Sequence, residues 1–223
     1  MGYYIDLFEI SIKEFAQKLK MTKLLPSSQL LKENIDVIFQ NIEKNNIHNI
    51  GELQQCLKTK PKVARFSEKT TIDLNYLTVL RREINSLHPE PRDIEGFPYM
   101  SQIIKEKLRS LGIKTTFDLF EYIKNSEVRY RLMEKLSCSE EEVLYLTQLV
   151  DVSRLKYVNQ TFATLLVACG YGSIEIIKKA DYKELYETIT AYNKTHGLYK
   201  GKIGLKDMAF FVESVPKNIE SIT

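Results

Sequence analysis

Turn-forming residues are scarce in this chain. Only nine of its 223 residues are Gly and six are Pro, whereas these two residues together average about 12% of a protein. Tryptophan is absent, yet 43% of the residues are hydrophobic. So much apolar material with so few turn residues does not fit disordered, collagen-like or turn-rich all-β chains. The length suggests one or two domains with a core of real size.

A strong excess of charge is also lacking. The 32 Lys and Arg residues nearly balance the 29 Asp and Glu residues, for a net charge of +3. Binding to nucleic acid or anionic lipid would therefore need a local basic patch. The three cysteines, Cys56, Cys138 and Cys169, are odd in number and far apart. This argues against a disulfide framework or a zinc knuckle and fits a reducing compartment.

No long apolar run is present. The apolar stretch Phe162 to Cys169 is much shorter than the roughly 20 residues that cross a bilayer. Asp6 and Glu9 precede the first Lys or Arg, which is not the layout of a signal peptide. We therefore expect a cytoplasmic protein with no membrane association.

Helical patterns recur along the whole sequence. Ser11 with Glu14, and Ser139 with Glu142, have the spacing of capping boxes ahead of apolar residues at helical intervals. Asp73 is a predicted N-cap. We predict an all-α fold, a helical bundle.

Two further stretches lie in the first part of the chain. Pro26 is predicted to open a single helix that reaches Ile42. The basic stretch Lys58 to Lys69 is only weakly periodic, and a flexible connector between two helices, with solvated lysines, is its simplest interpretation.

A domain boundary is predicted at the segment His88-Pro89-Glu90-Pro91, because two prolines prevent a helix from continuing. It divides the chain into an N-terminal helical domain, residues 1–90, and a second domain, residues 91–223.

The second domain contains an internal duplication. Residues 108–119 and 166–177 each have an apolar helix that ends at a glycine, Gly112 or Gly170, followed by an N-cap, Thr115 or Ser173. The copies cover about residues 91–150 and 151–223. A fainter third copy lies at residues 42–53, where Asn46 replaces the glycine, since Asn also tolerates a left-handed turn.

A helix-hairpin-helix unit has a characteristic layout. Two helices are joined by a tight turn, and a glycine, an apolar residue and a capping Ser or Thr follow the second helix. The residues that carry it in the second copy are Leu155, Tyr157, Val158, Phe162, Ala163, Leu166, Cys169, Gly170, Tyr171, Ala180, Asp181, Leu185 and the run 200–208. This region resembles the C-terminal module of an uncharacterised bacterial family, a domain of unknown function described as helix-hairpin-helix-like. The resemblance implies tandem helix-hairpin-helix-like units. The family has no assigned activity, so the resemblance predicts none for this chain.

Helix-hairpin-helix units of the DNA-binding type present backbone N–H groups to a phosphate through a Gly-apolar-Gly hairpin. Here Tyr157 and Asn159 replace the glycines, which disfavours phosphate. The positions that would contact phosphate or nucleic acid are Lys156, Tyr157, Asn159, Gln160, Thr161, Lys200, Gly201, Lys202 and Gly204.

No catalytic, metal or cofactor site is predicted. The three histidines are remote from one another, and Glu140 to Glu142 fit a helix first turn better than an acid–base pair. We therefore expect a non-catalytic binding or scaffold module for a macromolecular partner, without a small-molecule substrate. Sequence-independent binding of a nucleic-acid backbone is the alternative. An enzyme stays possible only if catalytic residues converge from distant segments.

Overall fold

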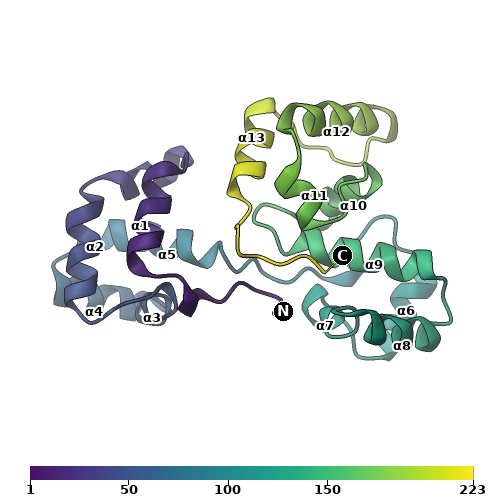
Figure 1. Cartoon of the computed structure of the whole chain (residues 1–223), viewed down its shortest axis with the longest axis horizontal. Coiled ribbons are helices and arrows are strands. Elements are labelled where there is room, and N and C mark those ends of the chain that lie inside the picture. The colour runs from purple at the N-terminus through teal and green to yellow at the C-terminus, as the bar shows by residue number, and fades with distance from the viewer. Residues whose placement is uncertain (223) are drawn as a thin grey trace. The chain divides into compact units, whose positions relative to one another are not determined.

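The computed structural model describes residues 1–222 and is all-α (Figure 1). The described residues contain helices and two isolated β-bridges but no β-strand. The chain divides into two compact units, an N-terminal unit of residues 2–88 and a C-terminal unit that begins at Pro89. Each unit is described by itself.

The N-terminal unit packs five α-helices around one apolar core. They are α1 (Ile12–Met21), α2 (Ile35–Lys44), α3 (Ile50–Cys56), α4 (Lys60–Thr70) and α5 (Leu74–Asn85), with short 3₁₀ helices at Leu7–Glu9 and Pro26–Lys32. Helix α5 packs against the second 3₁₀ helix, α4 and α3, while α1 packs on α2. Leu53, Leu77 and Leu80 are fully buried where these helices meet.

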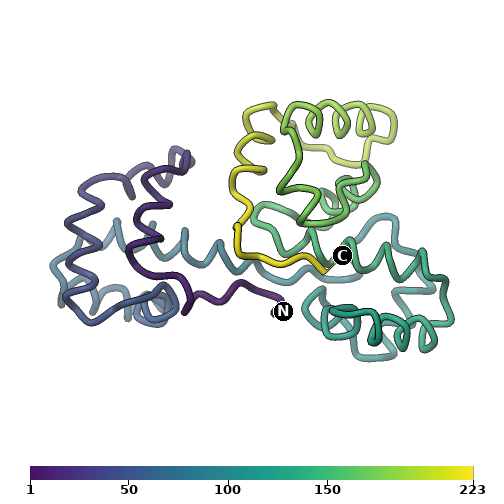
Figure 2. The backbone as a smooth tube through the Cα atoms, viewed as in Figure 1, coloured from purple at the N-terminus to yellow at the C-terminus, as the bar shows by residue number. Residues whose placement is uncertain are grey.

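The C-terminal unit contains the remaining helices. They are a 3₁₀ helix at Ile94–Gly96, α6 (Gln102–Ser110), α7 (Thr116–Phe120), α8 (Ser126–Leu136), α9 (Glu140–Ser153), α10 (Gln160–Ala168), α11 (Ile174–Lys179), α12 (Tyr182–His196) and α13 (Leu205–Ser214). Helix α9 is central to this unit, because it packs on α7, α8 and α10. The chain after α13 returns to lie beside α9 (Figure 2).

Most of the predicted helix starts are confirmed. The Ser11–Glu14 and Ser139–Glu142 capping boxes are both present. Asp73 accepts a hydrogen bond from the backbone N–H of Tyr76 at the start of α5.

Two predictions for the N-terminal unit were wrong. The helix expected from Pro26 to Ile42 is a 3₁₀ helix and α2, separated at Asn34, which has a left-handed backbone with φ 47°. Close to this break, the carbonyl of Leu31 accepts a hydrogen bond from the hydroxyl of Tyr76 at 3.0 Å. The weakly periodic stretch Lys58 to Lys69 largely forms the regular helix α4.

The repeated turn predicted from the sequence is present three times, and we call each instance an elbow. The turning residues Asn46, Gly112 and Gly170 have φ of 62°, 77° and 83°. Each is followed three residues later by an N-cap whose side chain accepts a backbone N–H of the next helix: Asn49, Thr115 and Ser173. The second and third elbows also share a backbone hydrogen bond that spans five residues and closes the preceding helix. It runs from Ile113 N–H to Leu108 O in one elbow and from Tyr171 N–H to Leu166 O in the other. That these elbows belong to helix-hairpin-helix units stays a prediction.

The first N–H group of the helix after each elbow finds its acceptor outside that helix. Ile50 donates to the carbonyl of Ile10 at 2.9 Å, and Thr116 donates to the carbonyl of Arg92 at 2.8 Å. In both elbows the carbonyl belongs to an extended segment earlier in the chain, which we call the entry segment. Each entry segment also forms one of the two isolated bridges, Ser11 with Asn49 or Asp93 with Thr115. The third elbow lacks such a segment.

Substitution of Gly170 tests the elbow geometry. A Cβ at this position would meet nothing within 4 Å, so Gly170→Ala should cost only left-handed strain, about 1 kcal/mol of unfolding free energy. Gly170→Asn should cost less, because Asn tolerates this conformation. Urea denaturation measures both. Equal losses for Ala and Asn would contradict the assignment of the cost to backbone conformation.

Candidate functional site

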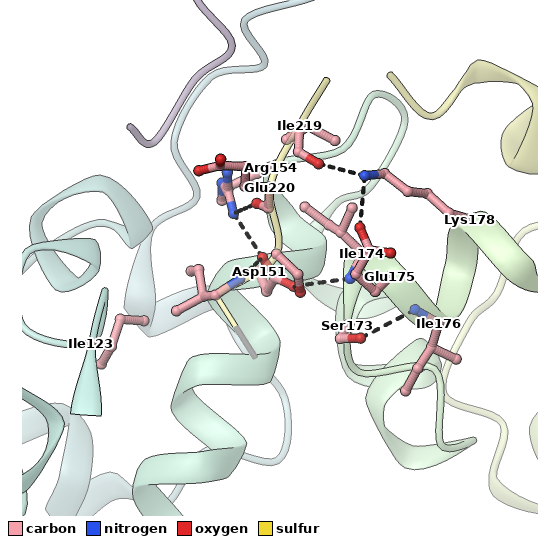
Figure 3. Close-up of polar contacts among 12 residues, drawn as sticks. Ile123, Asp151, Arg154, Ser173, Ile174, Glu175, Ile176, Lys178, Ile219 and Glu220 are labelled. Carbon is pink, nitrogen blue, oxygen red and sulfur yellow. Dashed lines mark hydrogen bonds and ion pairs between the residues drawn. The ribbon is translucent and has the colours of Figure 1, made fainter. Parts of the chain in front are cut away.

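A buried carboxylate, Asp151, replaces the missing entry segment at the third elbow (Figure 3). Its Oδ2 accepts the N–H of Ile174 at 2.9 Å and the hydroxyl of Ser221 at 2.5 Å. Its Oδ1 accepts the N–H of Ile222 at 3.1 Å and lies 2.7 Å from Nη1 of Arg154. Asp151 thus joins α9, the start of α11 and the C-terminal segment through one side chain.

The cation beside Asp151 is equally enclosed. Arg154 also donates to the carbonyl of Glu220 at 3.0 Å, and its guanidinium lies 5.5 Å from the ring centre of Phe120. The side chains of Asp151 and Arg154 are 0% and 1% exposed. Burial raises the pKa of the Asp151 carboxyl, opposed by its hydrogen bonds and by the arginine. A substrate cannot reach this pair without unfolding of the C-terminal segment, so we assign it a structural role.

One lysine and one arginine, from two other helices, also bind the C-terminal segment. Lys178 of α11 donates to the carbonyl of Ile219 at 2.6 Å (Figure 3) and to that of Lys217 at 3.2 Å. Arg129 of α8 donates to the carbonyl of Ile222 at 3.2 Å. The C-terminal segment is therefore an integral part of this unit's fold.

The first cluster of predicted contact residues, between positions 156 and 161, lies in the turn between α9 and α10 and in the first turn of α10. Tyr157 has φ 71°, the conformation that favours glycine, and its ring lies 5.5 Å from that of Phe210. Asn159 caps α10 by accepting the N–H of Phe162 at 2.8 Å. Gln160 packs against Gly96, whose added Cβ would lie 2.6 Å from the Gln160 amide nitrogen. Each of these three side chains thus has a structural partner.

The other two members of this cluster, Lys156 and Thr161, are half-buried. The ammonium of Lys156 lies 4.9 Å from the ring centre of Tyr157.

The second predicted cluster lies in the loop between α12 and α13. Lys200, Gly201 and Lys202 are exposed. The N–H of Gly204 donates to the Asp207 carboxylate at 3.0 Å, which places a negative charge at the start of α13 where a phosphate would otherwise sit.

The structure brings the two clusters into one neighbourhood. Phe162 of α10 lies 6.0 Å from Tyr199, the residue before Lys200, measured between ring centres. The same ring lies 5.4 Å from Phe211 of α13. Aromatic packing therefore connects the α9–α10 turn to the lysine loop, but contact with phosphate stays a prediction.

A groove that sequence reasoning missed runs between α8 and α9. It has a volume of about 600 Å³ and is formed by one stripe of each helix. The lining residues are Ser126, Arg129, Tyr130 and Met133 of α8, and Glu140, Glu141, Val143, Leu144 and Thr147 of α9. Tyr130 and Leu144 are 59% and 47% exposed. The feature of the sequence that could have indicated this groove is Leu144, an apolar residue outside the core stripe of α9.

The described residues contain no group of three or more His, Cys, Asp or Glu side chains placed to hold a metal ion. Burial raises the pKa of the Cys169 thiol to about 11 and also raises that of Cys138. Neither thiol therefore has the lowered pKa of a catalytic nucleophile. In residues 1–222 no helix is both long enough and apolar enough to span a bilayer.

A comparison with known protein families shows to which family this chain belongs. The family model described as "Domain of unknown function (DUF4332)" matches residues 98–217, more than half of the sequence. The chain belongs to the DUF4332 family. Neither the curated proteins nor the solved structures gave a match. The DUF4332 match confirms the expected domain of unknown function; it lies within the C-terminal unit and includes Asp151 and the α8–α9 groove.

Removal of one member of the buried pair tests its role in the DUF4332 fold. Asp151→Asn removes the negative charge that pairs with Arg154 and weakens the bonds from Ile174, Ser221 and Ile222, so the unfolding free energy should fall by about 3 kcal/mol. The double variant Asp151→Asn/Arg154→Met should recover part of this loss, because it also removes the buried cation that Asp151 pairs with. Thermal and urea denaturation followed by circular dichroism measure both. If the single variant loses less unfolding free energy than the double variant, the ion pair does not stabilise this fold.

Proposed function

We propose that this protein is a non-catalytic binding module that holds an apolar helical segment of a partner protein in the α8–α9 groove. The single observation that carries the proposal is the exposure of Tyr130 and Leu144 on facing helix stripes. Solvent-exposed apolar side chains that line a concave surface are typical of protein-interaction sites.

The stripes match a helix-in-groove mode of binding. The α8 members lie at positions i, i+3, i+4 and i+7, and so do four of the α9 members, beginning at Glu140. The groove therefore follows about two turns of each helix, roughly 10 Å at 1.5 Å per residue. Two turns of a partner helix fit along it.

Charge at the groove restricts the partner. Glu140 and Glu141 are exposed in the first turn of α9, and neither forms an ion pair with a described residue. Arg129 is already bound to two backbone carbonyls. We therefore expect a partner helix with apolar residues at helical spacing and a Lys or Arg at the end that meets Glu140.

The non-catalytic part of the proposal follows from where the titratable groups lie. The buried carboxylate Asp151, paired with Arg154, is enclosed. Catalysis needs such groups within hydrogen-bond reach of a substrate.

Helix-hairpin-helix-like units are a finer interpretation of the elbows, and their common geometry supports it. Nucleic-acid binding through the predicted turns has less support than protein binding. Asn159 and Gly204 already have intramolecular partners, and Asp207 repels phosphate from the start of α13.

Site-specific crosslinking tests the proposed groove. Photoreactive benzoylphenylalanine replaces Leu144 in the cells that naturally produce this protein, and it should form a discrete adduct with a second protein. Tyr130→Asp in the same chain should lower the yield roughly tenfold, because it places a charge in an apolar contact. The melting temperature should not change, since Tyr130 is exposed.

The control places the same photoreactive residue at Ile176 of α11, which is 46% exposed and lies outside the groove. No discrete adduct is expected there. Adducts of equal yield at both positions, or none at Leu144, would contradict the proposal.

A further inference from the structure

A second groove lies in the N-terminal unit, outside the part matched by the family model. It has a volume of about 500 Å³ and runs between α3 and α4. Its lining residues are Ile47, Glu52, Gln55 and Cys56 on the α3 side, and Lys62, Arg65, Phe66 and Lys69 on α4. Unlike the α8–α9 groove, this one is rich in cations.

Three cations lie on one face of α4. Lys62, Arg65 and Lys69 are spaced at i, i+3 and i+7, so they form a row of about 10 Å along the helix. All three are exposed. Lys62 donates to the carbonyl of Gln55 at 3.2 Å, and none of the three forms an ion pair with a described residue.

One carboxylate, Glu52, lines the groove and does not neutralise the row. Its Oε2 accepts the backbone N–H of His48 at 2.7 Å. This hydrogen bond lowers the pKa of Glu52, so the group is ionised at neutral pH. Three cationic side chains against one carboxylate leave the groove positive, and the neutral amide of Gln55 adds a donor.

We propose that the α3–α4 groove binds the sugar–phosphate backbone of a nucleic acid without reading its sequence. A row of cations along a helix matches a linear polyanion better than a single phosphate, and the guanidinium of Arg65 can donate two parallel hydrogen bonds to one phosphate. This inference is independent of the protein-binding groove and of the α9–α10 turn.

Fluorescence anisotropy with the full chain tests the inference. The probes are a labelled single-stranded oligonucleotide and its duplex, with inorganic phosphate as competitor. Three phosphate contacts predict that duplex affinity falls roughly 40-fold between about 50 and about 200 mM salt. Inorganic phosphate should not compete at the same ionic strength. Competition by phosphate alone would show a small-anion site and overturn the proposal.

Charge reversal locates the contact. Arg65→Glu with Lys69→Glu should lower duplex affinity by about tenfold or more. The control Lys23→Glu with Lys183→Glu changes the net charge equally at exposed residues outside the groove and should lower it less than about twofold. If circular dichroism shows that charge reversal unfolds the chain, the neutral double variant Arg65→Gln with Lys69→Gln is used instead. It should reduce the slope of log affinity against log salt concentration by about 2.

Three further results would overturn the proposal: no binding at low salt, equal losses in the groove and control variants, or loss only in a Lys200→Glu/Lys202→Glu variant. The last result would support the predicted lysine loop instead.

Discussion

The fold depends on an acceptor for the first N–H group of each helix that follows an elbow. A buried N–H without a partner costs about as much as a lost hydrogen bond. Ile50 and Thr116 meet this constraint with backbone carbonyls from extended entry segments. At the third elbow, between α10 and α11, the Asp151 carboxylate of α9 accepts the N–H of Ile174 instead. The same carboxylate pairs with Arg154, and both groups bind the C-terminal segment.

The sequence predicted those parts of the fold that local chemistry controls. Caps at Ser11 and Ser139, and the left-handed turns at Gly112 and Gly170, depend on residues within a few positions of one another. The break at Asn34 was not predicted. It coincides with a contact between Leu31 and Tyr76 that is remote in sequence, and such tertiary contacts override helix periodicity.

The candidate site was less predictable than the fold. Neither groove follows from one motif, because each needs two helices packed side by side. Asp151 did have a sequence signal, a charged residue three positions before Arg154 in an otherwise apolar part of α9. Its partners at Ile174 and Ile222 come from distant segments. The predicted turn and lysine loop were brought together by Phe162 and Tyr199, although neither ring was singled out for this contact.

Amide hydrogen exchange tests the central claim most directly. In the wild-type chain the amides of Ile50, Thr116 and Ile174 should all exchange slowly, since each has an acceptor outside its own helix. In an Asp151→Ala chain, exchange at Ile174 and Ile222 should accelerate together while Thr116 stays protected. Unchanged protection of Ile174 in that variant would show that the third elbow does not depend on the carboxylate, and would contradict this account.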